Sequence, residues 1–305
     1  MGSPAPVPPT APTPSHWEIR TTPYLWLAST HIDASAGGTQ VTATISALDL
    51  LKALQFGFMN VFEVRHDRVM FVMDSFFARV QDDATVGPFS ASLGPATIHQ
   101  PRADLHIPRI DVPIGPINTD VTANLFYLDT KLGYRILSHD LSPPGLGPDS
   151  LERREFIVDL LAGDRYWHLK NRIDVKIPPI QVPGFKIQPS FPAFPDLMLP
   201  GIHVKGVTLA GLDKTFEATT DWVDPLLGAR VRLDLPHKFF VTAIGDVGGF
   251  GIGSASDVTW QGAGLVGYKM SPRWTSVIGY RTLGLTRNGA EITMFGPLMG
   301  MSFKF

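Results

Sequence analysis

Apolar residues alternate with small or polar residues along most of this chain, and the C-terminal segment displays the pattern most simply. One parity holds Phe295, Pro297, Met299, Met301, Phe303 and Phe305, and the other holds Gly296, Leu298, Gly300, Ser302 and Lys304. Because successive side chains of a strand point to opposite faces, this segment predicts a strand with one apolar face. That face would line the core of a soluble sandwich or contact lipid around a membrane barrel.

The same period of two predicts about twelve antiparallel strands in all. Seven come first, near 17–28, 38–46, 55–66, 69–81, 119–137, 154–172 and 203–220. Five follow, at 226–235, 239–247, 257–269, 274–285 and the segment that ends at Phe305. The only short helix expected is at 46–54. An even number of strands would place both chain ends on one side of a membrane.

Composition favours a membrane barrel over other membrane proteins. Hydrophobic residues make up 44% of the chain and its mean hydropathy is +0.09, yet no run of 18 apolar residues occurs. A transmembrane helix is therefore excluded, whereas dispersed, alternating hydrophobicity is typical of a transmembrane barrel. The chain has no cysteine, which excludes disulfides and thiolate chemistry. A net charge of −2 gives no reason to expect a nucleic-acid partner.

Aromatic residues favour the barrel over the sandwich. If the chain ends on the periplasmic side, one set falls at the periplasmic rim: Trp17, Phe239, Tyr268, Trp274, Phe303 and Phe305. Trp26, Trp222 and Trp260 lie near the opposite ends of their strands. Aromatic rings collect at both membrane interfaces. We therefore expect an all-β fold, a transmembrane antiparallel up-and-down β-barrel of about twelve strands in the outer membrane of a Gram-negative bacterium.

Several segments resemble a widespread family of Gram-negative outer-membrane barrels that mostly carries no assigned function. They are PYLW (23–26), DWVDPLLGAR (221–230), GDVGGFGIGSASDVTWQ (245–261) and GYR (279–281). The C-terminal residues resemble the signal read by the barrel-assembly machinery: Phe295, Met299, Met301, Phe303 and Phe305. The resemblance covers 221–305 well and 1–80 loosely, and 82–202 departs from it. It implies a place among outer-membrane lipids and lipopolysaccharide, and no reaction.

The rest of the chain predicts one tail and one domain. We expect a disordered proline-rich tail over 1–15, which lacks the basic patch and apolar core of a signal peptide, so a targeting signal is expected to be absent. A single barrel domain is expected over 16–305, with proline-rich insertions at 82–118 and 173–202.

Two related motifs lie within these insertions. IPRIDVP (107–113) and IPPIQVP (177–183) agree at five of seven positions and lie symmetrically about residue 145. The symmetry predicts that they run side by side, with Ile110 paired to Ile180, although proline removes ladder donors. Strand parity places them on the periplasmic side. A duplication and a disordered insertion are the alternatives.

The parity opposite to the apolar face identifies the side chains expected to line the lumen. They are Glu63, Arg65, Asp74, Asp129, Lys131, Arg135, Asp159, Arg165, Arg230, Arg232, Asp234, Asp246 and Arg281, with Lys304 near the end. About twelve strands leave a narrow interior, in which unpaired charges are costly. We therefore expect Arg230, Arg232 and Arg281 to bridge to Asp234, Asp246 or other carboxylates.

Three functions fit such a barrel. The first is a narrow, porin-like, charge-lined pore for the passive transport of small solutes. The second is a closed structural barrel, or one that binds lipid or a partner, and the third, less favoured, is a lipid-modifying enzyme. The histidines have no metal-ligand spacing, no nucleophile elbow occurs, and GGFGIG (248–253) precedes a strand rather than the helix of a phosphate-binding loop. No catalytic residue, metal or cofactor is therefore assigned, and the oligomeric state stays open.

Overall fold

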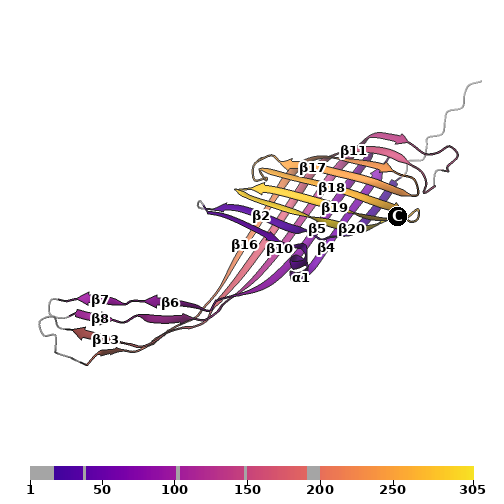
Figure 1. Ribbon diagram of the computed structural model, residues 1–305. Coiled ribbons are helices and arrows are strands. Elements are labelled where there is room, and N and C mark those ends of the chain that lie inside the picture. Colours follow the sequence, from indigo (N-terminus) through magenta and orange to yellow (C-terminus); the bar gives the residue numbers. More distant parts are fainter. Residues whose placement is uncertain (1–16, 37–38, 101–103, 148–149, 191–199) are drawn as a thin grey trace, which may run out of the picture. The chain divides into compact units, whose positions relative to one another are not determined.

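The computed structural model describes residues 17–36, 39–100, 104–147, 150–190 and 200–305 (Figure 1). The tail expected over 1–15 lies outside the described residues. The chain divides into two compact units. Residues 1–79, 124–169 and 220–305 form the first, which we call the barrel unit. Residues 80–123 and 170–219 form the second, the insert unit, and the insertions expected at 82–118 and 173–202 fall within it.

The barrel unit is a closed antiparallel β-barrel of ten strands. Its strands, in the order in which they pair, are β1 (Trp17–Trp26), β4 (Leu54–His66), β5 (Val69–Val86), β10 (Ile117–Asp140), β11 (Glu155–Ile177), β16 (Leu212–Asp234), β17 (Phe239–Gly249), β18 (Val258–Lys269), β19 (Trp274–Arg287) and β20 (Ala290–Lys304). Pairing of β1 with β20, for example Arg20 with Lys304, closes the sheet. The all-β antiparallel prediction is confirmed at this level.

The prediction was about twelve strands, and the sheet contains ten barrel strands and two strands outside the barrel. Two local differences explain which predicted strands are barrel strands. The strand expected at 38–46 is β3 (Thr39–Ile45), which pairs only with β2 (Ser29–Ala36) and lies outside the closed barrel. The strands expected at 203–220 and 226–235 are not separate barrel strands, because β16 runs without a break from Leu212 through Pro225 to Asp234. The helix expected at 46–54 is present as α1 (Ala47–Ala53).

The sequence prediction placed the insertions on the periplasmic side because it included β3 among the barrel strands. Without β3, each barrel strand from β4 to β11 runs in the opposite direction to the predicted one. Trp17, the first described residue of β1, and the end of β20 lie at one end of the barrel, which we call the terminal end, as the pairings of Trp17 with His66 and of Arg20 with Lys304 require. β5 and β11 start at that end, so residues 80–123 and 170–219 join the barrel strands at the opposite end. The expected periplasmic projection is therefore inconsistent with a periplasmic C-terminus.

The barrel has an apolar exterior and a packed interior. Side chains on its outer face include Leu25, Phe58, Leu132, Ile278 and Met299, all exposed. A hydrophobic core fills part of the interior, and Trp26 and Trp222 belong to it. These two tryptophans therefore do not join an outer aromatic band, whereas Trp260 is exposed. At the terminal end, ring contacts join Phe239 to Tyr268 and Trp274 to Phe303.

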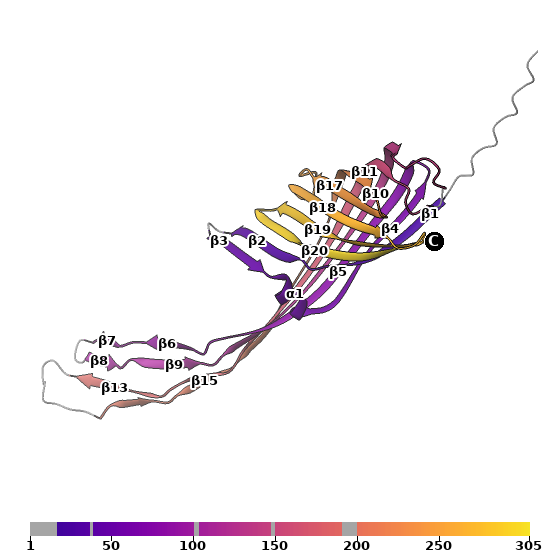
Figure 2. The same ribbon diagram turned by 45° about the vertical axis from the view of Figure 1, so that its right-hand side comes forward.

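Beyond the ends of β5, β10, β11 and β16, the insert unit contains short strands in three small sheets. β6 (Phe89–Leu93) pairs with β9 (Ile110–Ile114), and β12 (Ile180–Val182) pairs with β15 (Val207–Leu209). A four-stranded sheet has the order β14 (Ile202–Val204), β13 (Phe185–Ser190), β8 (Asp104–Ile107) and β7 (Ala96–His99). Figure 2 displays these strands from a second side.

The two proline motifs do not form the expected ladder. Ile110 pairs with Leu93, and Ile180 pairs with Leu209, so the predicted pairing of Ile110 with Ile180 is wrong. β9 and β12 nevertheless lie next to each other without a ladder between them. A Cβ on Gly115 would come within 2.8 Å of Pro178, which places the flanks of the two motifs in contact. The prolines of the motifs remove ladder donors, and each motif pairs instead with its outer neighbour.

Candidate functional site

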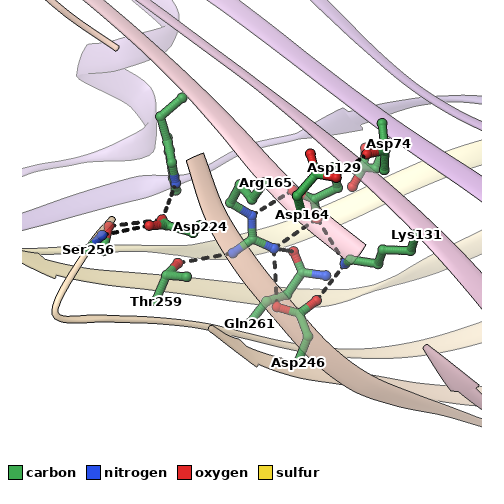
Figure 3. A network of polar contacts seen from close by, with 12 residues as sticks. Asp74, Asp129, Lys131, Asp164, Arg165, Asp224, Asp246, Ser256, Thr259 and Gln261 are labelled. Atoms are coloured by element: carbon green, nitrogen blue, oxygen red, sulfur yellow. Dashed lines mark hydrogen bonds and ion pairs between the residues drawn. The ribbon is translucent and has the colours of Figure 1, made fainter. Parts of the chain in front are cut away.

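The strand alternation sends charged side chains into the barrel, where Arg165 of β11 organises a buried ionic cluster (Figure 3). Its guanidinium donates to both oxygens of Asp129, at 2.6 and 2.8 Å, and to Asp246 at 3.2 Å. Lys131 Nζ lies 2.9 Å from Asp129 and 2.6 Å from Asp246. Two carboxylates are thus paired with two cations, and Arg165 is 0% exposed. Bidentate geometry and full pairing are what stabilise charges away from water.

Neutral groups extend this cluster to the opposite wall. Arg165 also donates to Thr259 at 3.1 Å and to Gln261 at 3.2 Å, both on β18. The amide oxygen of Gln261 in addition accepts from Arg281 of β19. Arg281 pairs with Asp74 at 3.0 Å and donates to the Tyr24 hydroxyl at 2.9 Å. The cluster therefore crosses the barrel interior rather than following one wall.

A second cluster lies nearer the terminal end of the barrel. Arg230 pairs with Glu63 at 2.6 Å and with Asp159 at 2.9 Å. Arg65 and Arg135 also contact Asp159, at 3.4 and 3.2 Å. Arg230 on β16 and Glu63 on β4 belong to strands that are not neighbours in the sheet, so this pair also bridges the interior. The side chain of Asp159 is 1% exposed.

Each of the three arginines predicted to bridge to Asp234, Asp246 or other carboxylates pairs with a carboxylate. Arg232 pairs with Asp234 at 2.9 Å, and Lys269 also contacts Asp234 at 2.9 Å. Arg230 pairs with Glu63 and Asp159, and Arg281 pairs with Asp74, which are carboxylates other than the two named. Asp246 pairs with Lys131 and Arg165. Lys304 contacts Glu18 at 3.6 Å, near the end of the barrel.

A layer of aromatic rings lies beside the Arg165 cluster. Five strands contribute Trp26, Phe76, Tyr127, Trp167 and Trp222, and each ring contacts the next at centroid distances of 5.0–5.9 Å. Tyr127 and Trp167 are 0% and 1% exposed. The Arg165 guanidinium lies 5.8 Å from the Trp167 ring centroid, and that of Arg281 lies 5.0 Å from Trp26, within the range of cation–π attraction.

Asp224 anchors the far side of the aromatic layer. It accepts from Trp167 Nε1 at 2.8 Å and from Trp222 Nε1 at 3.2 Å. The backbone N–H and hydroxyl of Ser256 donate to the same carboxylate, at 2.6 and 2.8 Å (Figure 3). Ser256 belongs to the connection between β17 and β18 and is fully buried. This loop is therefore held to the interior by hydrogen bonds to a buried carboxylate.

Three kinds of interior residue lie outside the set of charges predicted to line the lumen. Asp224 shares the parity of Arg230 and is buried. Tyr24 and Tyr127 are aromatic residues with a hydroxyl group, and neither was among the predicted lumen residues. Gln261 and Thr259 are uncharged and therefore escaped a search for inward charges. A parity count over all polar residues, rather than charged ones alone, could have found them.

The insert unit offers a second candidate site, because its sheets are amphipathic. Residues directly opposite each other in an antiparallel pair share a face. Ile180 lies opposite Leu209 and Val182 opposite Val207, whereas Gln181 lies opposite Thr208. Ile98 lies opposite Leu105, whereas Thr97 lies opposite His106.

The other pairs of the insert unit follow the same rule. Ala91 lies opposite Val112, and Ser92 lies opposite Asp111 with a hydrogen bond of 2.6 Å. Ile187 lies opposite Ile202, and Lys186 lies opposite His203. Each sheet therefore has one apolar and one polar face. On the apolar face Val112 of an inner strand is 4% exposed, whereas Val207 and Leu209 of an outer strand are more than half exposed.

Breaks that contain glycine or proline interrupt these strands, and the breaks in neighbouring strands lie next to each other. The breaks at 94–95 and 108–109 are neighbours, because a Cβ on Gly94 would come within 2.8 Å of the Pro108 carbonyl oxygen. The breaks at 183–184 and 205–206 also meet, since a Cβ on Gly184 would lie 3.0 Å from the Gly206 nitrogen. The parity of the apolar residues changes across each break, from Ile98 to Ala91 and from Val182 to Phe185, for example. After each two-residue break, the apolar residues therefore occupy the opposite parity of the sequence.

Chemistry beyond ion pairing is sparse in the described part of the chain. No group of three metal-ligating side chains comes together there, and no helix in it is long and apolar enough to cross a membrane. His106 Nε2 lies 2.9 Å from Ser190 Oγ, but its Nδ1 contacts the Thr97 hydroxyl rather than a carboxylate. The acid of a serine–histidine–aspartate arrangement is therefore not at its place.

Comparison with known proteins adds little. No family model and no curated protein matches this sequence. Among solved structures, similarity is found to the outer membrane protease OmpT from Escherichia coli, with 9% identity, coverage of 95% of this chain and 96% of that chain, and a TM-score of 0.33. The translocator domain of the autotransporter NalP from Neisseria meningitidis has 8% identity, coverage of 94% and 88%, and a TM-score of 0.29. The attachment invasion locus protein Ail of Yersinia pestis has 8% identity, coverage of 95% and 98%, and a TM-score of 0.27. Scores at this level carry no argument about function.

Proposed function

We propose that this protein is a closed outer-membrane β-barrel that anchors the insert unit, and that the apolar faces of the insert unit bind lipid acyl chains. The observation that carries the first part is the filled interior. Arg165, Asp159, Tyr127 and Trp167 are each at most 1% exposed although all lie inside the barrel. This is the second of the three functions considered above.

The exterior of the barrel supports the membrane location. Leu132, Leu227, Ile278 and Met299 are each more than half exposed and come from four different strands. In water such a surface would be costly, whereas lipid tails solvate it. Closure of the sheet removes the strand edges, which a membrane requires. Outer-membrane lipids and lipopolysaccharide are thus its proposed surroundings, and Phe295, Met299, Met301, Phe303 and Phe305 remain the proposed signal for barrel assembly.

A closed barrel is favoured over the narrow pore. Ten strands enclose less space than twelve, and two ionic clusters with an aromatic layer occupy it. In planar bilayers we expect no discrete current steps from the wild-type protein. Replacing Arg230 and Arg232 by serine should open at most a small conductance, because the Arg165 cluster and the aromatic layer stay in place. A steady wild-type current would support the pore and refute the closed barrel.

The insert unit supports binding of acyl chains for three reasons. Its apolar faces contain no hydrogen-bonding side chain among the paired residues, so an alkyl chain would leave no polar group unsatisfied. Val207, Leu209 and Ile202 on them are each more than half exposed. These residues occur on successive short strands, which suits an extended chain better than a compact ligand.

Acyl binding can be tested with a fluorescent fatty acid added to the protein in amphipol, which keeps the apolar exterior of the barrel covered. Leu209→Asn should weaken binding, because it adds a polar amide to the apolar face. Thr208→Asn is the matched control, since Thr208 is the adjacent residue on the polar face. Equal affinity of the wild-type protein and both variants would contradict a site on this face. Lipid hydrolysis that depends on Ser190 would instead favour the enzyme.

A further inference from the structure

α1 separates β3 from β4, which otherwise follow one another as a continuous strand. β1 and β2 both pair with β20 in one register, from Arg20 opposite Lys304 to Ala34 opposite Ala290. β3 and β4 both pair with this combined strand, with Thr30 opposite Ile45 and Pro23 opposite Asn60. The two registers differ by eight residues, which is the length of the segment 46–53 that separates β3 from β4. The segment with the helix is therefore looped out of the strand at one level along the barrel wall.

That height coincides with a change in the outer surface. On β20 the core residue Met294 points inward, so Phe295 and residues of the same parity point outward. Toward the terminal end the outward residues are apolar, with Met299 and Met301 exposed. In the other direction they are Thr293 and Glu291, which lie opposite His31 and Asp33. Polar contacts continue there, with His31 and Asp33 paired at 3.0 Å. The apolar band thus ends at Phe295.

α1 lies at this boundary and on the outer face. Ser29 is the direct partner of Phe295 and shares its face. The Ser29 hydroxyl accepts from the Ala47 N–H at 3.0 Å, which ties the first turn of the helix to that level. Ser46 caps the helix through the Asp49 N–H. Figures 1 and 2 both display α1 at the base of the β2–β3 hairpin.

The helix leaves apolar side chains without cover in the described part of the chain. Leu48 and Leu51, three residues apart, are 68% and 45% exposed, and no residue of α1 is buried. Residues three apart lie on one helix face. β4 begins directly after α1 and carries Phe56 and Phe58, both more than half exposed, on the outer face of the barrel. The leucines therefore continue the apolar band to its edge.

We infer that α1 is an interfacial membrane helix whose Leu48 and Leu51 enter the acyl-chain region of the bilayer. This inference rests on the proposed membrane-spanning barrel. The occupant is a lipid leaflet because the exposed leucines adjoin the lipid-facing Phe56 and Phe58 and stop where the outer face turns polar. Lys52 is 79% exposed at its side chain and is long enough to reach the headgroups from this level. A helix of this kind lies in the interface plane with its apolar side inward.

The chain has no cysteine, so single cysteines can be introduced and labelled cleanly. We suggest Leu48→Cys with an environment-sensitive NBD label, in phosphatidylcholine vesicles that contain brominated phosphatidylcholine as quencher. Phe58→Cys is the control for the barrel band, and Asp33→Cys is the control for the polar hairpin. Asp49→Cys tests the orientation of the helix. We expect strong quenching at positions 48 and 58, weaker quenching at 49, and none at 33.

The outcomes separate the two hypotheses. Quenching at 58 without quenching at 48 would overturn the interfacial helix and leave the membrane barrel intact. Equal quenching at 48 and 49 would contradict an oriented insertion. Absence of quenching at all four positions in correctly folded protein would refute the membrane-spanning barrel itself. Protection of position 48 by a second copy, detected as a disulfide crosslink between two chains of the unlabelled Leu48→Cys variant, would also overturn the lipid contact.

Discussion

Arg165 provides the sharpest test of a dry, closed lumen. The variant Arg165→Met keeps most of the side-chain length but removes five contacts, to Asp129 twice and to Asp246, Thr259 and Gln261 once each. Asp129 and Asp246 then share only Lys131, so one buried negative charge is left over. Breaking a buried ion pair from one side costs about 3–5 kcal/mol. We expect a loss of that size in the free energy of unfolding.

The measurement is urea-induced unfolding from phosphatidylcholine vesicles, followed by tryptophan fluorescence. Arg153→Met is the matched control, because Arg153 pairs with Asp140 at 2.7 Å on an exposed connection. A solvated pair of this kind contributes about 0–1 kcal/mol. The double variant Arg165→Met with Asp129→Leu should recover much of the loss, since Lys131 and Asp246 remain paired at 2.6 Å.

A small loss for Arg165→Met, equal to that for Arg153→Met, would refute this reasoning. It would mean that water reaches Asp129 and Asp246 and screens them, as it would in an open channel. The closed barrel would then have to be abandoned together with the magnitude. A large loss that the double variant does not recover would instead assign the effect to lost packing rather than to the unpaired charge.

Three further predictions concern other parts of the structure. Asp224→Leu should destabilise the barrel by about 1–3 kcal/mol for each buried donor left unsatisfied. Near-ultraviolet circular dichroism should report loosening of the Trp167–Trp222 stack, whose ring centroids are 5.6 Å apart. An unchanged spectrum would contradict the anchoring role of Asp224. Cysteines in place of Gln181 and Thr208 should form a disulfide, because the two residues are direct partners. Cysteines in place of Gln181 and Val207 should not, because these residues lie on opposite faces of the sheet. The reverse result would refute the register of β12 and β15. Hydrogen bonds from Ser142 and the Arg153 guanidinium lower the pKa of Asp140 to about 2, so their stabilisation is fully present above the ordinary pKa of 3.8 and is lost as the pH falls through 2. The variant Ser142→Ala removes the hydroxyl but keeps the backbone N–H, which donates to Asp140 at 2.8 Å. Carboxyl NMR titration should therefore place the Asp140 pKa partly nearer its ordinary value, and an unaltered pKa would exclude the contribution of the hydroxyl.

Local alternation determined much of the architecture. A period of two requires no knowledge of neighbouring strands, so the strands at 239–247, 257–269 and 274–285 were predicted close to β17, β18 and β19. The same parity selected Asp159 and Arg281, which are 1% and 4% exposed, and Arg230, whose side chain is 19% exposed. A short helix was predicted at 46–54, and α1 confirms it.

Closure and partner choice required the tertiary structure, because both depend on contacts between residues far apart in the chain. Alternation cannot tell a barrel strand from a hairpin outside it, so β3 was counted in and the side of the insertions was reversed. The parity of a residue predicts whether its charged side chain faces the interior. It does not predict which residue that side chain pairs with. Arg230 meets Glu63 across 167 residues because the barrel brings β4 opposite β16. The two proline motifs are alike in sequence, but backbone donors decide pairing, so each motif pairs with its outer neighbour rather than with the other.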